Sequence, residues 1–379
     1  MNYIALKDVC TINMGQSPES SSYNEIGDGI PFFQGNADFG ERYPITRVWC
    51  NKPTKVAKAE DILISVRAPI GAMNYAKEKC CIGRGVAALT PNEEKVSSEF
   101  IFWLLKGKNN ELNQKGTGST FKAIGRKVLE EIQVPEINLE LQRKYASNLE
   151  RIYSIIQDRQ RQLEQLDKLV RARFVEMFGD CVINPKGWNT QSLEDISAVG
   201  SSKRVFVEEL QETGIPFYRG TEVGALAEGR QISPELFITK EHYKELCKAT
   251  GTPQIGDLLM PSICPDGRIW MVNTNMPFYF KDGRVLWVHA IDKNYNPIFL
   301  LYTLKDRIMT DYNSIASGTT FAELKIFALK KCQIFNVPIA LQNQFANFVK
   351  QVDKSKDSVQ KALDEAQLLF DSLMQQYFG

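Results

Sequence analysis

Residues 141–178 constrain the fold of this chain more than any other stretch, because their apolar spacing fits only one structure. Apolar side chains alternate at intervals of four and three residues, flanked by Arg, Gln, Glu, Lys and Asp, with no Pro or internal Gly before Gly179. This spacing is typical of a coiled-coil seam and predicts one helix of about ten turns. The predicted seam contains Leu149, Ile152, Ile156, Leu163, Leu166 and Val170, with Arg159 and Arg173 in its two polar positions.

A second stretch with the same alternation lies at the other end of the chain. Its predicted seam contains Phe348, Val352, Val359, Ala362, Ala366 and Leu369, with Ser355 in the one polar position. A single amphipathic helix cannot bury its own stripe, so the two helices are expected to pair. The segment between them is long enough for a domain whose ends lie close together, which predicts an antiparallel pair.

The two halves of the chain also repeat one another in sequence. Ile215-Pro-Phe answers Ile30-Pro-Phe, and Asp257-Leu-Leu answers Asp61-Ile-Leu. Later matches share a displacement of 200 residues, and they pair 83–84 with 283–284, 104 with 304, 118–121 with 318–321, 141–142 with 341–342, and 178–179 with 378–379. So many matches in one order indicate a duplicated unit.

These patterns predict an α+β fold with an internal pseudo-two-fold repeat. Two similar mixed α/β domains are separated by a long antiparallel two-helix coiled coil. The predicted boundaries are a first domain at 1–138, a first spacer helix at 139–179, a second domain at 180–338 and a second spacer helix at 339–379.

Composition excludes several classes of protein. No apolar run approaches the roughly 18 residues of a membrane span, and the N-terminus lacks the pattern of a signal peptide, which predicts a cytoplasmic protein without a membrane partner. The eight cysteines form no C-x-x-C, and the only histidines are His242 and His289, so no metal site is expected. The net charge of +1 argues against tight DNA binding by this chain alone.

Motifs for catalysis are also missing. There is no Gly-rich cofactor loop with an Asn-Pro-Pro-aromatic or Asp-Pro-Pro-aromatic stretch, as an adenine methyltransferase needs, and there is no P-loop. Glu60 and Asp61 ahead of Arg67 are the best candidates for a nuclease site. However, Asp257 repeats Asp61, which favours a turn or a cap. We therefore expect no catalytic residues in this chain.

Two unlike surfaces held apart by stiff helices suit a long target that is contacted at two places. One helix of about 37 residues spans about 55 Å, which is about one and a half turns of B-DNA. DNA recognised in two parts is one interpretation. A two-headed coiled-coil adaptor that binds only proteins is the alternative, and geometry alone leaves both open.

Particular motifs resemble the specificity subunit of type I DNA restriction-modification systems. They are EDILISVRAPIG, GRGVAAL, GSTFKAI, QVPEINLELQRKYA, and MFGD followed by NPKGW, together with the duplication and the two helices. The resemblance covers essentially the whole chain. One departure is Cys181, which lies between MFGD and NPKGW at a position where such subunits often have Pro. It affects only the linker there.

The resemblance implies a non-catalytic DNA-binding subunit with two target recognition domains for a split, asymmetric target in double-stranded DNA. It implies that the helices set the spacing and bind two methyltransferase subunits. S-adenosylmethionine is expected on those partners and no cofactor on this chain. Restriction subunits with a translocase activity complete the complex. The partners would then supply much of the phosphate contact, which explains the low net charge.

Candidate DNA contacts fall into two groups. Residues that differ between the halves are candidates for base contacts, because Gln and Asn suit adenine and Arg suits guanine; they are Gln34, Asn36, Arg67, Arg219, Thr221 and Glu222. The other group lies in the loops 118–122 and 318–321, where short hydroxyls precede a helix and suit a phosphate or a helix cap. That group contains Ser119, Thr120, Lys122, Thr319 and Thr320.

Overall fold

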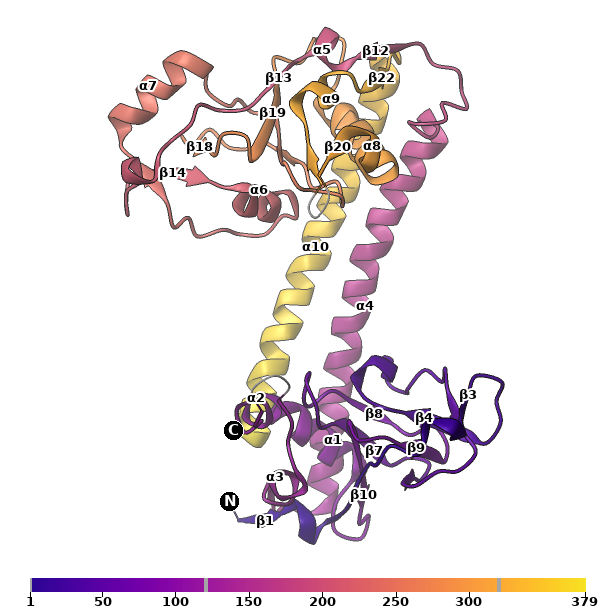
Figure 1. The fold of residues 1–379 in the computed structure, drawn as a ribbon. Coiled ribbons are helices and arrows are strands. Elements are labelled where there is room, and N and C mark those ends of the chain that lie inside the picture. Colours follow the sequence, from indigo (N-terminus) through magenta and orange to yellow (C-terminus); the bar gives the residue numbers. More distant parts are fainter. Residues whose placement is uncertain (1, 119–121, 319–321) are drawn as a thin grey trace. The chain divides into compact units, whose positions relative to one another are not determined.

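The computed structural model describes residues 2–118, 122–318 and 322–379. The chain divides into two compact units (Figure 1). The first unit comprises 1–161 and 360–379, and the second comprises 162–359. Each unit therefore contains one segment of each long helix, together with its own sheets.

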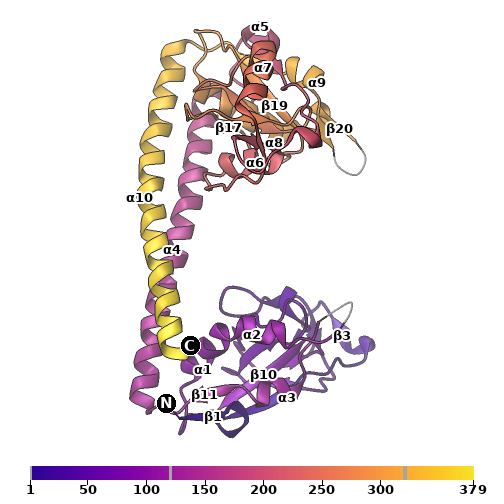
Figure 2. The ribbon, with the colours of Figure 1, turned by 90° about the vertical axis from the view of Figure 1, so that its left-hand side faces the viewer.

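The two long helices are α4 (Leu139–Phe178) and α10 (Ile339–Phe378), and each has 40 residues. Within the first unit, Tyr145 stacks on Tyr377 with ring centroids 3.8 Å apart, and Tyr153 lies 6.0 Å from Phe370. As the residue number rises along α4, it falls along α10, so the segments are antiparallel, as predicted. Figure 2 shows the two helices side by side from a second direction.

The same antiparallel arrangement holds within the second unit. The ring of Phe174 on α4 packs edge-on against Phe345 on α10, with centroids 5.4 Å apart. Further along α10, Lys356 forms an ion pair with Asp167 of α4.

The seam of α4 is largely as predicted, whereas that of α10 needs correction. Leu149, Ile156 and Val170 are buried, but Leu369 is 50% exposed and its neighbour Phe370 is buried instead. Leu369 is thus not part of the seam. The physical reason is the core of the first unit, where Phe370 packs against the rings of Trp103 and Tyr153. Position 370 also matches Val170 at the 200-residue displacement. The remaining predicted seam residues are buried or partly buried, and they are Ile152, Leu163, Leu166, Phe348, Val352, Val359, Ala362 and Ala366.

The first unit is built around a four-stranded antiparallel sheet. Its strands, in spatial order, are β2 (Cys10–Met14), β10 (Val86–Pro91), β7 (Ile62–Ser65) and β8 (Met73–Tyr75). A five-stranded sheet follows the order β3 (Tyr23–Asn24), β5 (Trp49–Cys50), β4 (Ile30–Phe33), β9 (Cys80–Ile82) and β6 (Val56–Ala57). The remaining elements are β1 (Tyr3–Ala5) paired with β11 (Gln133–Pro135), α1 (Ser98–Gly107), α2 (Asn109–Gln114), α3 (Arg126–Glu130), and the 3₁₀ helices η1 (Leu6–Asp8), η2 (Ser20–Ser22) and η3 (Asn36–Asp38).

The second unit repeats the four-stranded sheet as β13 (Ala198–Gly200), β19 (Val285–His289), β16 (Leu258–Pro261) and β17 (Trp270–Met271). A smaller sheet has the order β15 (Phe237–Ile238), β14 (Ile215–Tyr218) and β18 (Tyr279–Phe280). The remaining elements are β12 (Thr190–Ser192) paired with β22 (Gln333–Phe335), β20 (Ala316–Ser317) paired with β21 (Glu323–Leu324), α5 (Leu193–Ile196), α6 (Gly220–Ala227), α7 (Lys240–Thr250), α8 (Pro297–Ile315), α9 (Ile326–Lys330) and η4 (Val207–Glu209).

Strand pairing places the repeat in a slightly different register from the one that the sequence indicates. Leu89 pairs with Ile62, and Val288 pairs with Leu258, the counterpart of Ile62. The two central strands are therefore displaced by 199 residues and not by 200. The helices α4 and α10 do keep the displacement of 200.

A buried glutamine fixes the start of each long helix in the same way. In the first unit, the backbone N–H of Ser97, the N-cap of α1, donates to Gln142 Oε1 over 2.8 Å. In the second unit, the N–H of Asn296, the N-cap of α8, donates to Gln342 Oε1 over the same 2.8 Å. Both glutamines are at most 1% exposed. They join the start of the long helix to the helix that packs against it.

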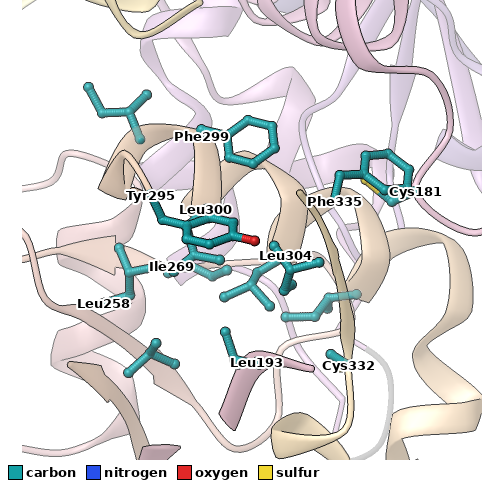
Figure 3. Close-up of a cluster of buried hydrophobic side chains, with 14 of the residues drawn as sticks. Cys181, Leu193, Leu258, Ile269, Tyr295, Phe299, Leu300, Leu304, Cys332 and Phe335 are labelled. Carbon is teal, nitrogen blue, oxygen red and sulfur yellow. The ribbon is translucent and has the colours of Figure 1, made fainter. Parts of the chain in front are cut away.

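The large core of the second unit combines α4, α8 and α10 with one face of the four-stranded sheet. Figure 3 shows Leu300 and Leu304 of α8 on the side of Leu258 of β16. The ring of Phe299 packs against Phe178 of α4, with ring centroids 4.8 Å apart. In the first unit, Phe100 of α1 occupies the place of Phe299 and packs against Phe378, with ring centroids 5.3 Å apart. Apolar burial between helix and sheet thus holds each unit together.

The predicted turns at Asp61 and Asp257 are present. Asp61 Oδ2 accepts from the backbone N–H of Lys58, and Asp257 Oδ2 accepts from that of Gln254, so both close a turn, as predicted. Seven of the eight cysteines are buried. Within the ranges that the structure describes, no helix is long and apolar enough to cross a membrane.

Candidate nucleic-acid interface

In the first unit, three of the predicted contact residues meet at the end of strand β7. The backbone N–H of Val66 donates to the carbonyl of Gly85 over 2.9 Å, and that of Ala68 donates to the carbonyl of Lys122 over 3.0 Å. Arg67, between them, forms a β-bridge with Ala123. These bonds bring Arg67 and Lys122 to one edge of the sheet, although they are far apart in sequence.

Gln34 reaches the same edge from strand β4. The N–H of Gly83 donates to the carbonyl of Phe33 over 2.8 Å. A Cβ atom at Gly85 would lie only 2.3 Å from the carbonyl oxygen of Gln34, so only glycine permits this close approach. Asn36 begins η3 just beyond, and Asp38 Oδ2 closes the turn by accepting from the N–H of Gln34. Gln34, Arg67 and Lys122 therefore form one surface.

This surface carries uncompensated positive charge. The side chains of Gln34, Arg67, Arg84 and Lys122 are exposed. Arg84 lies in the turn between β9 and β10 and was not among the predicted contacts, although its basic side chain between two glycines was the available signal. Among the residues that the structure describes, no carboxylate forms an ion pair with Arg67, Arg84 or Lys122. We call these four residues the first-unit basic edge.

In the second unit, the corresponding edge is a hollow of about 570 Å³. The N–H of Ser262 donates to the carbonyl of Arg284 over 2.9 Å, as Val66 does to Gly85. Arg284 is therefore the structural counterpart of Gly85 and not of Arg84. The turn before β19 is one residue longer than that before β10. The hollow is lined by Arg219, Gly220, Thr221, Glu222, Pro261, Ser262, Ile263, Arg268, Lys281 and Arg284.

Three predicted residues of this hollow are bonded to one another. Arg219 Nη2 donates to Glu222 Oε1 over 2.6 Å, and Arg219 N–H donates to Glu222 Oε2 over 2.8 Å. The hydroxyl of Thr221 donates to Glu222 Oε2 over 3.0 Å. Glu222 thus closes the turn as Asp38 does in the first unit, and it is not a free acceptor for a base.

The pKa shifts of Arg219 and Glu222 follow from these contacts. The hydrogen bond that Arg219 donates to Glu222 raises the pKa of Arg219, and a second carboxylate, Glu235, lies 3.1 Å from its Nη2. Burial favours the neutral form of Glu222, but the hydrogen bonds from the side chain and backbone of Arg219 outweigh it and lower its pKa to about 2. Both groups are charged at neutral pH.

The other arginines of the hollow are also paired. Arg284 forms an ion pair with Glu323 of strand β21, and Arg268 Nε lies 2.8 Å from Asp266 Oδ2. A hydrogen bond donated by Lys325 and the charges of Arg284 and Lys325 lower the pKa of Glu323. Sequence reasoning did not select Arg268, Arg284 or Glu323. Glu323 lies two residues after the 318–321 loop, so the repeat offered a signal for it.

Some predicted residues have no structural test. Ser119, Thr120, Thr319 and Thr320 lie outside the described residues. Across the described parts of the chain, no group of three His, Cys, Asp or Glu side chains is arranged to hold a metal ion. The groups that are present can donate hydrogen bonds to phosphate oxygens and to the base edges of a nucleic acid.

Comparisons with known proteins agree with this organisation. The family model described as type I restriction modification DNA specificity domain matches residues 1–166 and again 185–367. A curated relative from Methanocaldococcus jannaschii, the type I restriction enzyme MjaIX specificity subunit, is 24% identical over 97% of this chain and 90% of its own length.

Two further relatives differ in how much they cover. The MjaX specificity subunit from the same organism is 48% identical over 157 residues, which span only 41% of this chain and 37% of that protein. The crystal structure of a type I restriction-modification S subunit from M. genitalium has a TM-score of 0.61 at 15% identity, covering all of this chain and 96% of that one. This likeness supports the fold.

Proposed function

The chain belongs to the family of DNA specificity subunits of type I restriction-modification systems, and from this we propose that it recognises a DNA target in two separate parts, one with each unit. The observation that carries the proposal is the repeated edge. In both units the same backbone bonds join the end of one strand to the same turn, while the exposed side chains differ. An adaptor that binds only proteins is not favoured by the relatives.

The chemistry of modification and cleavage belongs, in this proposal, to partner subunits. This chain contributes recognition and has no catalytic role, and S-adenosylmethionine is held by the methyltransferase partner. Restriction subunits join the same complex. The near-neutral net charge of the chain is consistent with partners that share the phosphate contacts.

Two methyltransferase subunits are proposed to dock on the long helices. Support comes from the repeat: Leu169 on α4 and Leu369 on α10 occupy equivalent positions and are 48% and 50% exposed. Exposed leucines at equivalent positions are suited to contact two copies of one partner.

A domain exchange tests the assignment of half-targets. Residues 15–85, which hold Gln34, Arg67 and Arg84 of the first-unit basic edge but leave α1, α4 and α10 untouched, are replaced by those of another family member. The full complex with its methyltransferase is then expressed, and methylated positions are sequenced. We expect one half of the target to change and the other to remain. Exchange of 202–284 is the matched experiment and should change the other half. Changes in both halves after a single exchange would refute the proposal.

Insertions test the proposed spacing role of the helices. Four residues are added between Arg161 and Gln162 and four between Val359 and Gln360, which keeps both seams near their original faces. Each helix lengthens by about 6 Å, so the unrecognised spacer should grow by about two base pairs at 3.4 Å each. An unchanged spacer with retained methylation contradicts a spacing role.

A further inference from the structure

The repeated edges of the two units differ in charge compensation, and this difference carries an inference about how each contacts DNA. In the first unit, the side chains of Arg67, Arg84 and Lys122 are exposed and, among the described residues, have no carboxylate partner. In the second unit, Arg219, Arg268 and Arg284 each have at least one carboxylate partner. Lys281 is the exception in the hollow, since no ion pair joins it to a described carboxylate.

Unpaired and paired cations respond differently to a phosphate. An exposed, unpaired cation gains a new ion pair at any phosphate and releases counterions, whatever the sequence. A cation that already faces a carboxylate only exchanges one ion pair for another. Its contribution to the free energy of DNA binding is therefore small. The first-unit basic edge therefore suits contact with the DNA backbone. The arginines of the second unit do not add the same sequence-independent affinity.

The carboxylates also fix where the guanidinium groups lie. Glu222 binds Nε and Nη2 of Arg219, and Glu323 binds Nη1 of Arg284. Arginine has five N–H donors in a planar arrangement, so donors remain for a base edge while one side stays bonded to the carboxylate. A guanidinium held in this way is preorganised for a geometrically defined acceptor pair, such as O6 and N7 of guanine.

We infer that Glu222 and Glu323 are specificity-determining positioning residues of the second unit, which hold Arg219 and Arg284 in place and offset their charge, so that this unit binds tightly only at its own half-target. The inference rests on the proposed function. Glu323 is the better residue to test, because Glu222 also accepts from the backbone N–H of Arg219 and its loss would disturb the turn.

The experiment uses the full chain assembled with its methyltransferase subunits and four DNA duplexes. One duplex carries the whole target identified by methylation sequencing, two carry one half each, and one carries neither half. Kd is measured for each at several salt concentrations. The wild-type complex must first prefer the whole target; a complex without any preference refutes the proposed function itself and thereby the inference.

With that preference established, Glu323→Gln is expected to bind the duplex that lacks the second half about threefold to tenfold more tightly than the wild type does. The salt dependence should steepen by about one phosphate contact. Affinity for the whole target should change less than twofold. Glu245→Gln removes an equal charge from an exposed position on α7 and should change none of these values.

Two further variants separate positioning from charge. Glu323→Asp keeps the carboxylate and should retain wild-type discrimination. The double variant Arg284→Gln/Glu323→Gln removes both charges of the pair and leaves only Lys325 without its carboxylate. We expect a salt dependence closer to the wild type than that of Glu323→Gln, with weaker preference for the second half. If Glu323→Gln and Glu245→Gln behave alike while the wild type still prefers the whole target, the inference is wrong and the proposed function stands.

Discussion

The two units share their framework and differ in the part that bears the candidate contacts. Both have a four-stranded antiparallel sheet, a parallel strand pair beside it and a helix packed on α4 and α10. Beyond that framework, the first unit adds β3 and β6 to its second sheet, whereas the second unit inserts α6 and α7. The shared sheet and helix of each unit form one apolar core with α4 and α10. The variable elements lie outside that core. Duplication therefore preserved the core while the exposed edges diverged.

The largest test of the shared framework removes an equivalent aromatic ring from each unit. Phe178 is 0% exposed in the second unit, and Phe378 is 5% exposed in the first. Phe178→Ala and Phe378→Ala should each lower the free energy of unfolding of their own unit by about 3–5 kcal/mol. Hydrogen exchange measured by mass spectrometry resolves the two units. Phe327→Ala, at a ring that is 68% exposed, is the control and should have little effect. Equal loss of protection in both units from one variant would contradict two separate cores.

The next test concerns the buried glutamines. Gln142→Ala leaves the N–H of Ser97 and the carbonyl of Ile137 without their partner, and Gln342→Ala does the same at Asn296 and Val337. Each variant should destabilise its unit by about 2–3 kcal/mol, because buried polar groups lose their hydrogen bonds. Urea denaturation, together with hydrogen exchange resolved for each unit, measures the loss of stability in both variants. A large effect in only one unit would show that the two helix starts are not equivalent.

A smaller effect distinguishes the second unit by its pH dependence. Glu222 has a pKa of about 2 in the folded chain, below its usual 4.5. Its ion pair therefore stabilises the unit fully above the usual pKa, and this contribution of about 1 kcal/mol is lost as pH falls from about 5 toward 2. Glu222→Gln should flatten this acid-dependent part of the stability curve. Thermal unfolding at several pH values provides the measurement, and an unaltered acid slope would argue against the pair.

The smallest expected effect is on DNA affinity. Arg67→Gln removes one unpaired cation of the first-unit edge, so the complex should bind DNA about threefold to fivefold more weakly, with a salt slope reduced by about one. The loss should be the same whichever sequence occupies the second half. Lys7→Gln, at an exposed lysine of η1, is the matched control. A loss that depends on the second half would place Arg67 outside the proposed role.

The sequence determined a great deal about the framework. The heptad spacing predicted both long helices, the long segment between them predicted an antiparallel pair, and the repeat predicted two similar mixed α/β units. The register of the second seam was less certain from spacing alone, because α10 has apolar residues on adjoining faces. Phe370 is buried and Leu369 is not. The core of the first unit decides between these neighbours, and the displacement of 200 residues from Val170 would have predicted the same choice.

The candidate contacts were predictable only in part. Residue type and non-matching positions pointed to Gln34, Arg67 and Lys122, which do meet at one edge. Arg219 pairs with Glu222 three residues along the chain, but its second carboxylate, Glu235, and the partner of Arg284, Glu323, are brought near by folding and not by local spacing. Likewise, because the turn before β19 has one extra residue, Arg284 occupies the position in the second unit that Gly85 occupies in the first.

Apolar periodicity is a local property that extends over many residues, so the sequence by itself determined the elements, the duplication and the pairing of the helices. The charge state of each edge depends on which carboxylates reach it through space. Only the tertiary structure decided that Arg67, Arg84 and Lys122 meet no described carboxylate and that Glu235 and Glu323 reach Arg219 and Arg284. Such ion pairs form between side chains that folding brings within a few ångströms.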